Sequence, residues 1–205
     1  MSEETKEYII NKAQSLFYNY GIRSITMDFI ASELGMSKRT LYENFKNKDA
    51  LIKACLEQGR KAQERDMCDI ISNSPNTIEM LARCYNRIIY HINQTSRSFQ
   101  LDIKQMNSRL DNGNDNYREK QFQYIRNILS KGVEEGLIRS DLDLDIVTSL
   151  HNGQIMWIHE TPEYQDEVNV ANTLSVYTKI FLYGIVTEKG KQILDKAYEN
   201  FSQTL

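Results

Sequence analysis

The sequence predicts an all-α protein in which a small N-terminal bundle of three helices precedes a larger helical domain. Apolar residues recur three and four positions apart through most of the 205 residues, which is the spacing of a buried helix face. The chain contains only two prolines and nine glycines, which leaves little room for a turn-rich β architecture. The predicted division separates residues 1–52 from residues 53–205.

Residues 26–34 predict a short helix that ends in a tight turn. Thr26 can cap this helix, because its hydroxyl can accept hydrogen bonds from the free amides of the first turn. The buried stripe of the helix has the spacing i, i+3, i+4 and i+7 and consists of Met27, Ile30, Ala31 and Leu34. Gly35 follows the stripe, where a residue with positive φ commonly ends a helix, and Met36 is expected to fill the turn toward the core.

A second short helix is expected to begin after Ser37, which can cap it in the same way. Leu41 and Phe45 lie four residues apart, so both are expected to face inward. The opposite face then presents cations and a phenol, namely Lys38, Arg39, Tyr42 and Lys46. Asn47 can cap a third helix with Lys48 in its first turn, where free amides can bind a phosphate.

The charge of this segment differs from that of the whole chain. Residues 38–53 contain five cations and two acids, a net charge of +3, whereas the whole chain carries −3. A locally basic segment on an acidic protein is expected where phosphates are bound. Residues 26–45 therefore predict a helix-turn-helix whose second helix enters a DNA major groove. The alternative is an ordinary pair of capped surface helices.

The segment from about Ile9 to Leu51 resembles the DNA-binding domain of the TetR family of bacterial transcriptional repressors. The matching positions are Ile10, Ala13, Leu16, Phe17, Tyr20-Gly21, Thr26-Met-Asp-x-Ile-Ala, Leu34-Gly-Met-Ser-Lys, Thr40-Leu-Tyr, Phe45 and Lys48-Asp-Ala-Leu. So many positions at fixed spacing make the resemblance specific. One departure is Phe29, where the family more often has a small or acidic residue. This ring is expected to pack on the first helix or on a neighbouring segment.

The resemblance implies DNA contacts position by position. The positions that commonly touch phosphates are occupied by Thr26, Ser37, Thr40, Tyr42 and Lys48. The exposed recognition face that can reach base edges carries Lys38, Arg39 and Asn44, and Lys46 adds a further cation. Phosphate contacts would set the register and base contacts the sequence preference. The alternative for each side chain is simple solvation, and for Tyr42 a half-buried place in the core.

Composition excludes several classes of protein. No apolar run approaches the roughly 18 residues of a membrane span, and the acidic N-terminus lacks the apolar region of a secretory signal. The three cysteines, Cys55, Cys68 and Cys84, are odd in number and widely spaced. This argues for a reducing cytoplasm rather than a disulfide framework, with a redox-sensing thiol as the alternative to inert packing thiols.

Beyond Leu51 the sequence predicts more helices, the first of them running to about Ile71. Ser74, followed by a proline, has the form of an N-cap, and Asp143 can cap a later helix. The segment 168–186 is apolar on more than one side, so it is expected to be buried on more than one side. This favours a two-fold homodimer built from the last two long helices, with a fully buried monomer helix as the alternative. The residues assigned to the dimer contact are Trp157, Leu174, Tyr177, Phe181, Gly184 and Ile185.

The resemblance also implies an inducer cavity in the middle of the chain, for a small apolar or aromatic effector. The candidate lining residues are Tyr85, His91, Phe99, Met106, Tyr117, Tyr124, His151 and Trp157. The alternative is that these aromatic and methionine side chains form plain core. No metal or other cofactor is expected, because His151 and His159 are eight residues apart and lack the four-residue spacing of a helical zinc pair.

Residues 1–52 are therefore expected to be a DNA-binding domain, and residues 53–205 a helical regulatory and dimerisation domain. The resemblance implies a sequence-specific transcriptional regulator, a dimeric repressor released from a palindromic operator by a small-molecule inducer. One alternative is a helical protein-interaction module whose helix-turn-helix does not bind DNA. Another is a helical enzyme, but the sequence displays no phosphate-cradling glycine loop, nucleophile elbow or acid/base constellation.

Overall fold

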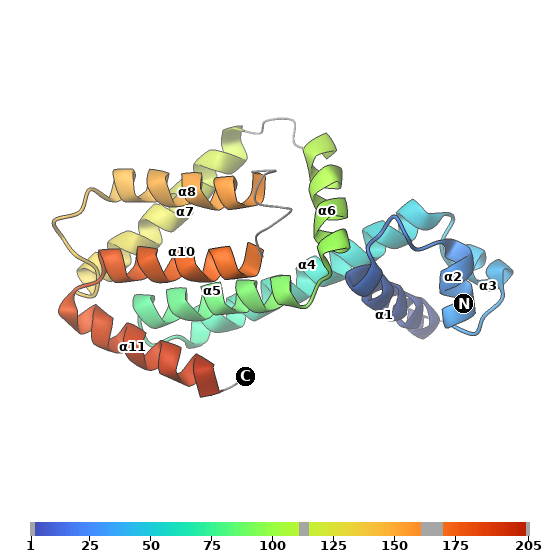
Figure 1. Cartoon of the computed structure of the whole chain (residues 1–205), viewed down its shortest axis with the longest axis horizontal. Coiled ribbons are helices and arrows are strands. Elements are labelled where there is room, and N and C mark those ends of the chain that lie inside the picture. The colour runs from blue at the N-terminus through green and yellow to red at the C-terminus, as the bar shows by residue number, and fades with distance from the viewer. Residues whose placement is uncertain (1–2, 111–114, 161–169, 204–205) are drawn as a thin grey trace. The chain divides into compact units, whose positions relative to one another are not determined.

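The protein consists of helices that form two compact units. A computed structural model describes residues 3–110, 115–160 and 170–203. Over these residues the only β pairing is an isolated antiparallel bridge between Ile138 and Val186, so the predicted all-α class is confirmed. The helices are α1 (Glu3–Tyr20), α2 (Met27–Glu33), α3 (Lys38–Asn44), α4 (Lys48–Asn73), α5 (Thr77–Asn93), α6 (Arg97–Leu110), α7 (Asp115–Glu134), α8 (Leu144–Glu160), α10 (Val170–Ile185) and α11 (Glu188–Gln203) (Figure 1).

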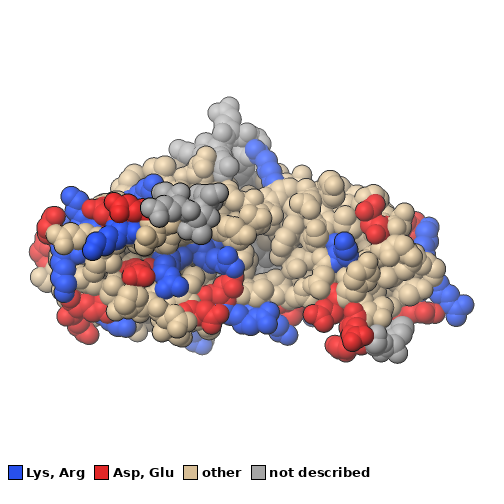
Figure 2. Space-filling model, turned by 90° about the horizontal axis from the view of Figure 1, so that it is seen from below, with Lys and Arg blue, Asp and Glu red and all other residues tan. Residues whose placement is uncertain are grey.

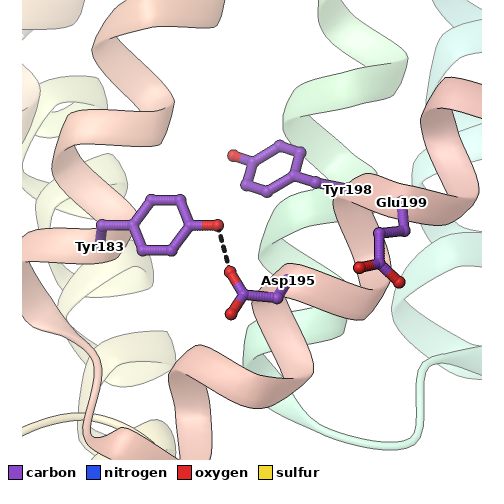
Figure 3. A pocket seen from close by; sticks show the side chains of 4 residues that line it. All are labelled: Tyr183, Asp195, Tyr198 and Glu199. Carbon is purple, nitrogen blue, oxygen red and sulfur yellow. Dashed lines mark hydrogen bonds between the residues drawn. The ribbon is translucent and has the colours of Figure 1, made fainter.

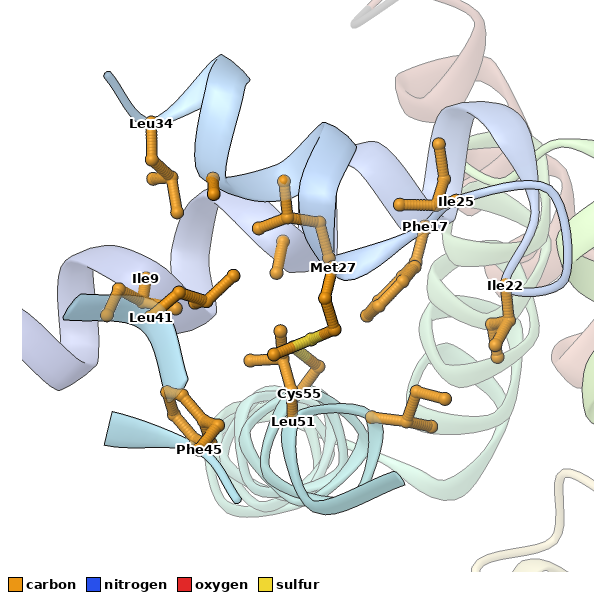
Figure 4. Packing of buried hydrophobic residues seen from close by; sticks show 14 residues of the cluster. Ile9, Phe17, Ile22, Ile25, Met27, Leu34, Leu41, Phe45, Leu51 and Cys55 are labelled. Carbon is orange, nitrogen blue, oxygen red and sulfur yellow. The ribbon is translucent and has the colours of Figure 1, made fainter. Parts of the chain in front are cut away.

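The first unit comprises Met1–Asp66 and Gln94–Asn112 and contains the helix-turn-helix. Its core is assembled from α1, α2, α3 and the beginning of α4. In Figure 4 the side chains of Phe17, Met27, Leu41 and Leu51 point toward a common centre. Phe17, Leu41 and Leu51 are at most 1% exposed. Burying a side chain of this size stabilises a fold by about 1.5–3 kcal/mol, so these few residues hold the short helices α2 and α3 in place.

The predicted caps of the three helices are confirmed. Thr26 Oγ1 accepts a hydrogen bond from Phe29 N at 3.1 Å, and Ser37 Oγ accepts one from Thr40 N at 3.1 Å. Asn47 Oδ1 accepts one from Ala50 N at 2.9 Å. Each side-chain oxygen satisfies an amide that the helix itself leaves without a partner.

The turn between α2 and α3 closes as the sequence predicts. Gly35 has φ +62°, a backbone conformation in which a side chain would be strained. Gly35 N donates to Ser32 O and Met36 N donates to Ala31 O, both at 3.0 Å. This pair of hydrogen bonds ends α2, and Met36 packs partly buried against the core of the first unit.

The first unit also contains a segment that the sequence did not assign to it. Helix α6 packs on α1, and Phe99, Ile103 and Met106 contact the helix-turn-helix core. The side chains of Phe99 and Tyr18 meet edge to face at 4.7 Å between ring centroids. The predicted boundary between a DNA-binding domain and a regulatory domain, after residue 52, stays a prediction. The compact units have different bounds, because the first unit extends to Asp66 and also includes Gln94–Asn112.

The second unit comprises Met67–Asn93 and Gly113–Leu205, and α5 lies at its centre. Helix α5 packs against α7, α10 and α11, while α8 packs against α7 and α10. The bridge between Ile138 and Val186 joins the segment after α7 to the end of α10. Helix α11, which the sequence analysis did not single out, contributes Leu194 and Ala197 to the core.

One predicted cap in this unit is wrong and one is confirmed. Helix α5 begins at Thr77 and is capped by Asn76, whose Oδ1 accepts from Glu79 N at 2.9 Å. The hydroxyl of Ser74 instead donates to Ile70 O at 2.6 Å, near the end of α4. Asp143 caps α8 as predicted, since its Oδ1 accepts from Asp145 N and Ile146 N. No helix in the described residues is long and apolar enough to cross a membrane.

Candidate nucleic-acid interface

The outward face of α3 is polar because its inward face is filled by two apolar side chains. Leu41 is fully buried and Phe45 nearly so. Arg39 lies on the opposite side of the helix, with 88% of its side chain exposed. Lys38 and Tyr42 flank it and are also exposed. Tyr42 is therefore not a half-buried core tyrosine, and the three side chains share a surface that can meet a ligand.

Both cations of this face are paired with acids in the same unit. Lys38 Nζ lies 2.6 Å from Asp28 Oδ2, and Arg39 Nε lies 2.8 Å from Glu43 Oε1. All four side chains are well exposed, and such surface pairs contribute only about 0–1 kcal/mol each. An incoming phosphate or base edge could therefore replace either acid at little energetic cost.

The hydroxyl groups around the turn are close together. Ser37 Oγ and Thr40 Oγ1 lie 2.8 Å apart, and Thr26 and Ser37 are exposed. Their oxygens cap helices, but a hydroxyl that accepts a hydrogen bond can still donate its own proton. Thr26 could thus cap α2 and donate to a phosphate oxygen at the same time, whereas one of the Ser37 and Thr40 hydroxyls donates to the other and only its partner keeps a free proton.

Asn44 does not lie on the exposed face where the sequence analysis expected it. It is half-buried, because it follows Leu41 by three residues and so shares the inward side of α3. Its Nδ2 donates to Thr40 O at 2.8 Å. Its Oδ1 is buried without a hydrogen-bond partner. As it stands, Asn44 supports α3 rather than presenting an amide to a ligand.

Lys48 stands at the first residue of α4, and Lys46 precedes it on the surface. Lys48 is half-buried, and this burial lowers the pKa of its ammonium group. The neighbouring carboxylates of Asp102 and Asp49 raise the pKa and so oppose the effect of burial. A partly desolvated ammonium beside a helix N-terminus is well suited to an anion.

The expectation that Phe29 packs on another segment stays a prediction. Phe29 is 42% exposed, since α2 buries the opposite stripe that contains Met27 and Ile30. Phe29 follows Asp28, the partner of Lys38, on the first turn of α2. An aromatic side chain is therefore exposed near the cations of α3.

Charge is mixed on the one face of the protein that Figure 2 shows. Acidic and basic side chains lie close to one another there. The whole chain carries a net −3, so the positive excess of residues 38–53 is a local feature. Such an excess raises the local attraction for polyanions without requiring a basic protein.

The eight residues predicted to line an effector pocket are divided between the two units, each of which is described by itself. Phe99 and Met106 pack on the core of the first unit, because α6 belongs there. Tyr124 and Trp157 are exposed, and His91 is half-buried. The side chain of Tyr117 lies outside the part of the chain that the structure describes. Of the set, Tyr85 and His151 are in contact.

A buried polar trio in the second unit is formed by His151, Tyr85 and Tyr177. The Nε2 atom of His151 lies 3.1 Å from the Tyr85 hydroxyl, and its Nδ1 lies 2.9 Å from the Tyr177 hydroxyl. The imidazole also stacks on Phe181 at 4.6 Å between ring centroids. Burial lowers the pKa of His151 to about 4 and raises the pKa values of both tyrosines. The ring is therefore neutral, with one donor and one acceptor nitrogen for the two hydroxyls.

A surface pocket of about 370 Å³ lies between α10 and α11 and contains none of the predicted pocket residues. Figure 3 shows its lining side chains, Tyr183, Asp195, Tyr198 and Glu199. The Tyr183 hydroxyl donates to Asp195 Oδ1 at 2.5 Å, and burial together with Asp195 raises the pKa of Tyr183 to about 12. The sequence pattern did not indicate this pocket, because its residues come from two helices, three of them from α11.

Helices α8 and α10, which lie side by side in Figure 1, each carry a stripe of exposed apolar side chains. On α8 the stripe is Ile146, Leu150, Gly153 and Trp157, and on α10 it is Val176, Ile180 and Tyr183. A Cβ atom added at Gly153 or Gly184 would meet no atom within 4 Å. This surface, called here the α8–α10 face, could be approached closely by another helix.

Two residues assigned to a dimer contact lie elsewhere. Leu174 and Ile185 are buried inside their own unit, at 2% and 5% exposure. Tyr177 and Phe181 are half-buried beside His151, while Trp157 lies on the α8–α10 face and Gly184 is exposed. The sequence showed that α10 is apolar on two sides, but not which side covers the core. Within the described residues, no group of three or more His, Cys, Asp or Glu side chains could hold a metal ion.

The chain is similar to regulators of transcription. Residues 9–55 match the sequence pattern of the family described as "Bacterial regulatory proteins, tetR family". The chain is 25% identical over 144 residues to the HTH-type transcriptional repressor KstR2 of Mycobacterium tuberculosis, covering 68% of this chain and 72% of KstR2. It is 23% identical over 161 residues to the HTH-type transcriptional regulator SrpR of Pseudomonas putida, covering 75% of this chain and 73% of SrpR.

Solved structures share the fold over nearly the whole chain. A TetR-family transcriptional regulator from Marinobacter aquaeolei has a TM-score of 0.67 and 20% identity, covering 97% of this chain and 98% of its own. A transcriptional regulator from Saccharomonospora viridis, solved in complex with choline, has a TM-score of 0.65 and 19% identity, covering 91% of this chain and 100% of its own. KstR2, described as a ketosteroid transcriptional regulator, has a TM-score of 0.58 and 22% identity, covering 92% of this chain and 98% of its own.

Proposed function

Because this chain belongs to the TetR family of bacterial transcriptional regulators, we propose that it is a dimeric repressor that a small molecule releases from a near-palindromic DNA operator. The observation that carries this proposal is the outward face of α3. Lys38, Arg39 and Tyr42 are exposed there, and the buried Leu41 holds the helix against its core. A short, rigidly seated helix with exposed cations suits the major groove.

The exposed groups divide by the part of DNA that they could reach. Thr26, Ser37, Thr40, Tyr42 and Lys48 would contact phosphates and set the register of the complex. Arg39 would contact base edges, since a guanidinium can donate two hydrogen bonds to guanine. Lys38 and Lys46 would add charge on either side of it. Asn44 would reach a base only if its hydrogen bond to Thr40 O were broken.

The α8–α10 face is the proposed contact between two copies of the chain. Its side chains, led by Ile180 at 69% exposure, are apolar and lie on neighbouring helices. Burying apolar area contributes about 25 cal/mol per Å², so covering this face would stabilise an assembly. A two-fold dimer would present two α3 helices to two half-sites, which is how helix-turn-helix proteins gain affinity and read inverted repeats.

An effector is proposed to act through the second unit, near the polar trio of His151, Tyr85 and Tyr177. The trio places one neutral imidazole and two hydroxyls beside the Phe181 ring, a mixture that suits a small aromatic molecule with one polar group. The choline complex of the Saccharomonospora viridis regulator supports the proposal that a small molecule acts on this chain too. Such a molecule would release DNA only by binding the released conformation better than the DNA-bound one.

The test of the proposed function is selection of sequences from a pool of random DNA duplexes by the purified protein. A recovered inverted repeat, bound more weakly as salt increases, is the expected result. Recovery of no preferred sequence, together with binding that does not respond to salt, would contradict it. That outcome would favour the alternative of a helical protein-interaction module.

A further inference from the structure

A buried carboxylate on α6 holds the turn that leads into the helix-turn-helix. Asp102 is 8% exposed, and its Oδ2 atom accepts hydrogen bonds from Ile22 N at 2.7 Å and from Arg23 N at 2.9 Å. These two amides lie between the end of α1 and the start of α2. Hydrogen bonds to an ionised carboxylate are about twice as strong as those between neutral groups.

The same turn is fitted closely to α6. Gly21 has φ +84°, and a Cβ atom there would lie 2.7 Å from Ser98 Cβ and 3.2 Å from Asp102 Oδ2. Ser96 N, just before α6, donates to Tyr18 O at 2.6 Å. Only glycine at position 21 therefore allows the turn to approach α6 closely enough for the Asp102 carboxylate to reach both amides.

One cation forms an ion pair with the buried carboxylate. Arg23 Nε is 3.3 Å from Asp102 Oδ1, and the Asp102 charge also favours the ammonium form of Lys48. Arg23 precedes the helix-turn-helix and Lys48 follows it. A buried charge is costly unless it is paired and hydrogen-bonded, and Asp102 meets both conditions through the Arg23 side chain and the amides of Ile22 and Arg23.

We propose that Asp102 is a positioning residue for DNA recognition: its carboxylate fixes the turn at residues 22–23 and thereby the direction in which α2 and α3 point. The inference rests on the proposed DNA-binding function. It makes α6 a segment that can alter operator affinity without touching DNA, since loss of the two hydrogen bonds would leave the turn free to shift. Asp102 differs in this from the candidate contacts on α3, which act at the DNA itself.

The test compares Asp102→Ala, Asp102→Asn and a control, Asp145→Asn. Asp145 is an exposed acid of α8 that pairs with Arg126 in the second unit, so its replacement changes the net charge equally without touching the turn. The probes are the duplex selected by the wild-type protein and a scrambled duplex of the same composition. The measurements are the ratio of the two dissociation constants, the thermal unfolding curve, and hydrogen exchange at the amides of Ile22 and Arg23.

We expect Asp102→Ala to lower the ratio about tenfold and Asp102→Asn, whose amide oxygen can still accept, to lower it about threefold. Exchange at both amides should accelerate in the same order, and Asp145→Asn should leave the ratio unchanged. A purely structural role would reduce the folded fraction and weaken both duplexes equally, so the ratio would stay constant. An unchanged ratio in Asp102→Asn, or an equal change in the control, overturns the inference.

The outcome for the wild-type protein separates the two proposals. If it selects no duplex, the proposed function fails, and this inference fails with it. If it selects a duplex whose preference does not depend on Asp102, only the inference fails. If Asp102→Ala does not fold, Asp102→Asn decides the result, because it keeps both an acceptor and the side-chain volume.

Discussion

The ammonium group of Lys38 lies 2.6 Å from the carboxylate of Asp28, so an ion pair joins the first turn of α3 to the first turn of α2. The carboxylate complements the positive N-terminal end of α2, and it also reduces the positive potential of the surface that the proposed complex presents to DNA. Asp28 should therefore contribute to folding while opposing DNA binding.

The first prediction concerns Asp28→Asn. Removing this charge should raise affinity for both selected and scrambled duplexes about threefold at low salt, because Lys38 then faces phosphates without an acidic partner. The measurement is fluorescence anisotropy over a series of salt concentrations, with Glu79→Gln on α5 of the second unit as the charge-matched control. Affinity that stays at the wild-type value would show that Lys38 does not face DNA.

The second prediction concerns Lys48→Ala. Loss of one phosphate contact should weaken binding to all duplexes and flatten the slope of log affinity against log salt by about one unit. Lys61→Ala, which removes an exposed cation of α4, is the control and should leave the slope in place. Equal slopes for wild type and Lys48→Ala would exclude the phosphate contact.

The third prediction concerns Arg39→Ala, which should change sequence preference rather than general affinity. If Arg39 contacts a base edge, its loss should relax the sequence preference at one position of each half-site. The lost discrimination against the wrong base there should be about 1–3 kcal/mol. Repeating the duplex selection with the variant measures this directly. An equal loss on every sequence would assign Arg39 to the phosphate backbone instead.

The fourth prediction tests the α8–α10 face. Ile180→Glu places a charge in the middle of the proposed contact and should yield a monomer in light scattering at micromolar concentration. Operator affinity should fall at least about tenfold, because a monomer binds one half-site at a time whereas a dimer binds both half-sites together. Ile71→Glu, at an exposed apolar position of α4, is the matched control and should remain a dimer. A dimeric Ile180→Glu protein would place the interface elsewhere.

The fifth prediction is a pH dependence of stability from His151. Its pKa is lowered from 6.5 to about 4 in the folded protein, so the unfolded chain binds a proton between these values that the folded chain does not. The neutral ring therefore contributes about 3 kcal/mol to the free energy of unfolding. This contribution is fully present above pH 6.5 and is lost as the pH falls toward 4. Urea unfolding at several pH values should show this slope, and His151→Gln should reduce it. Parallel curves for the two proteins would contradict the assignment.

Sequence reasoning succeeded where structure is local and failed where it is not. The caps at Thr26, Ser37 and Asn47 follow from the hydrogen-bonding capacity of one side chain within three residues, and all three are confirmed. The Ser74 cap failed because Asn76, two residues later, offers a competing acceptor. Both residues can cap a helix, and the sequence alone does not rank them.

The predicted pocket set stays a prediction, because its members are divided between the two units. Phe99 and His151 each lie on the apolar face of a predicted helix. Phe99 packs on the helix-turn-helix core, whereas His151 packs in the second unit. Periodicity identifies a buried helix face, not the element that covers it. The dimer contact predicted for Leu174 is wrong for the same reason. Helix α10 has two apolar sides, and Leu174 lies on the side that faces its own core.

The sequence by itself determined the helix-turn-helix, because its caps, its Gly35 turn and its buried stripe are set by residues a few positions apart. It also determined that α10 needs burial on more than one side. The tertiary structure alone decided that α6 belongs to the same unit as the helix-turn-helix and that Asp102 binds the Ile22 amide 80 residues away. A contact of that separation depends on how complete helices pack, and no local pattern encodes it.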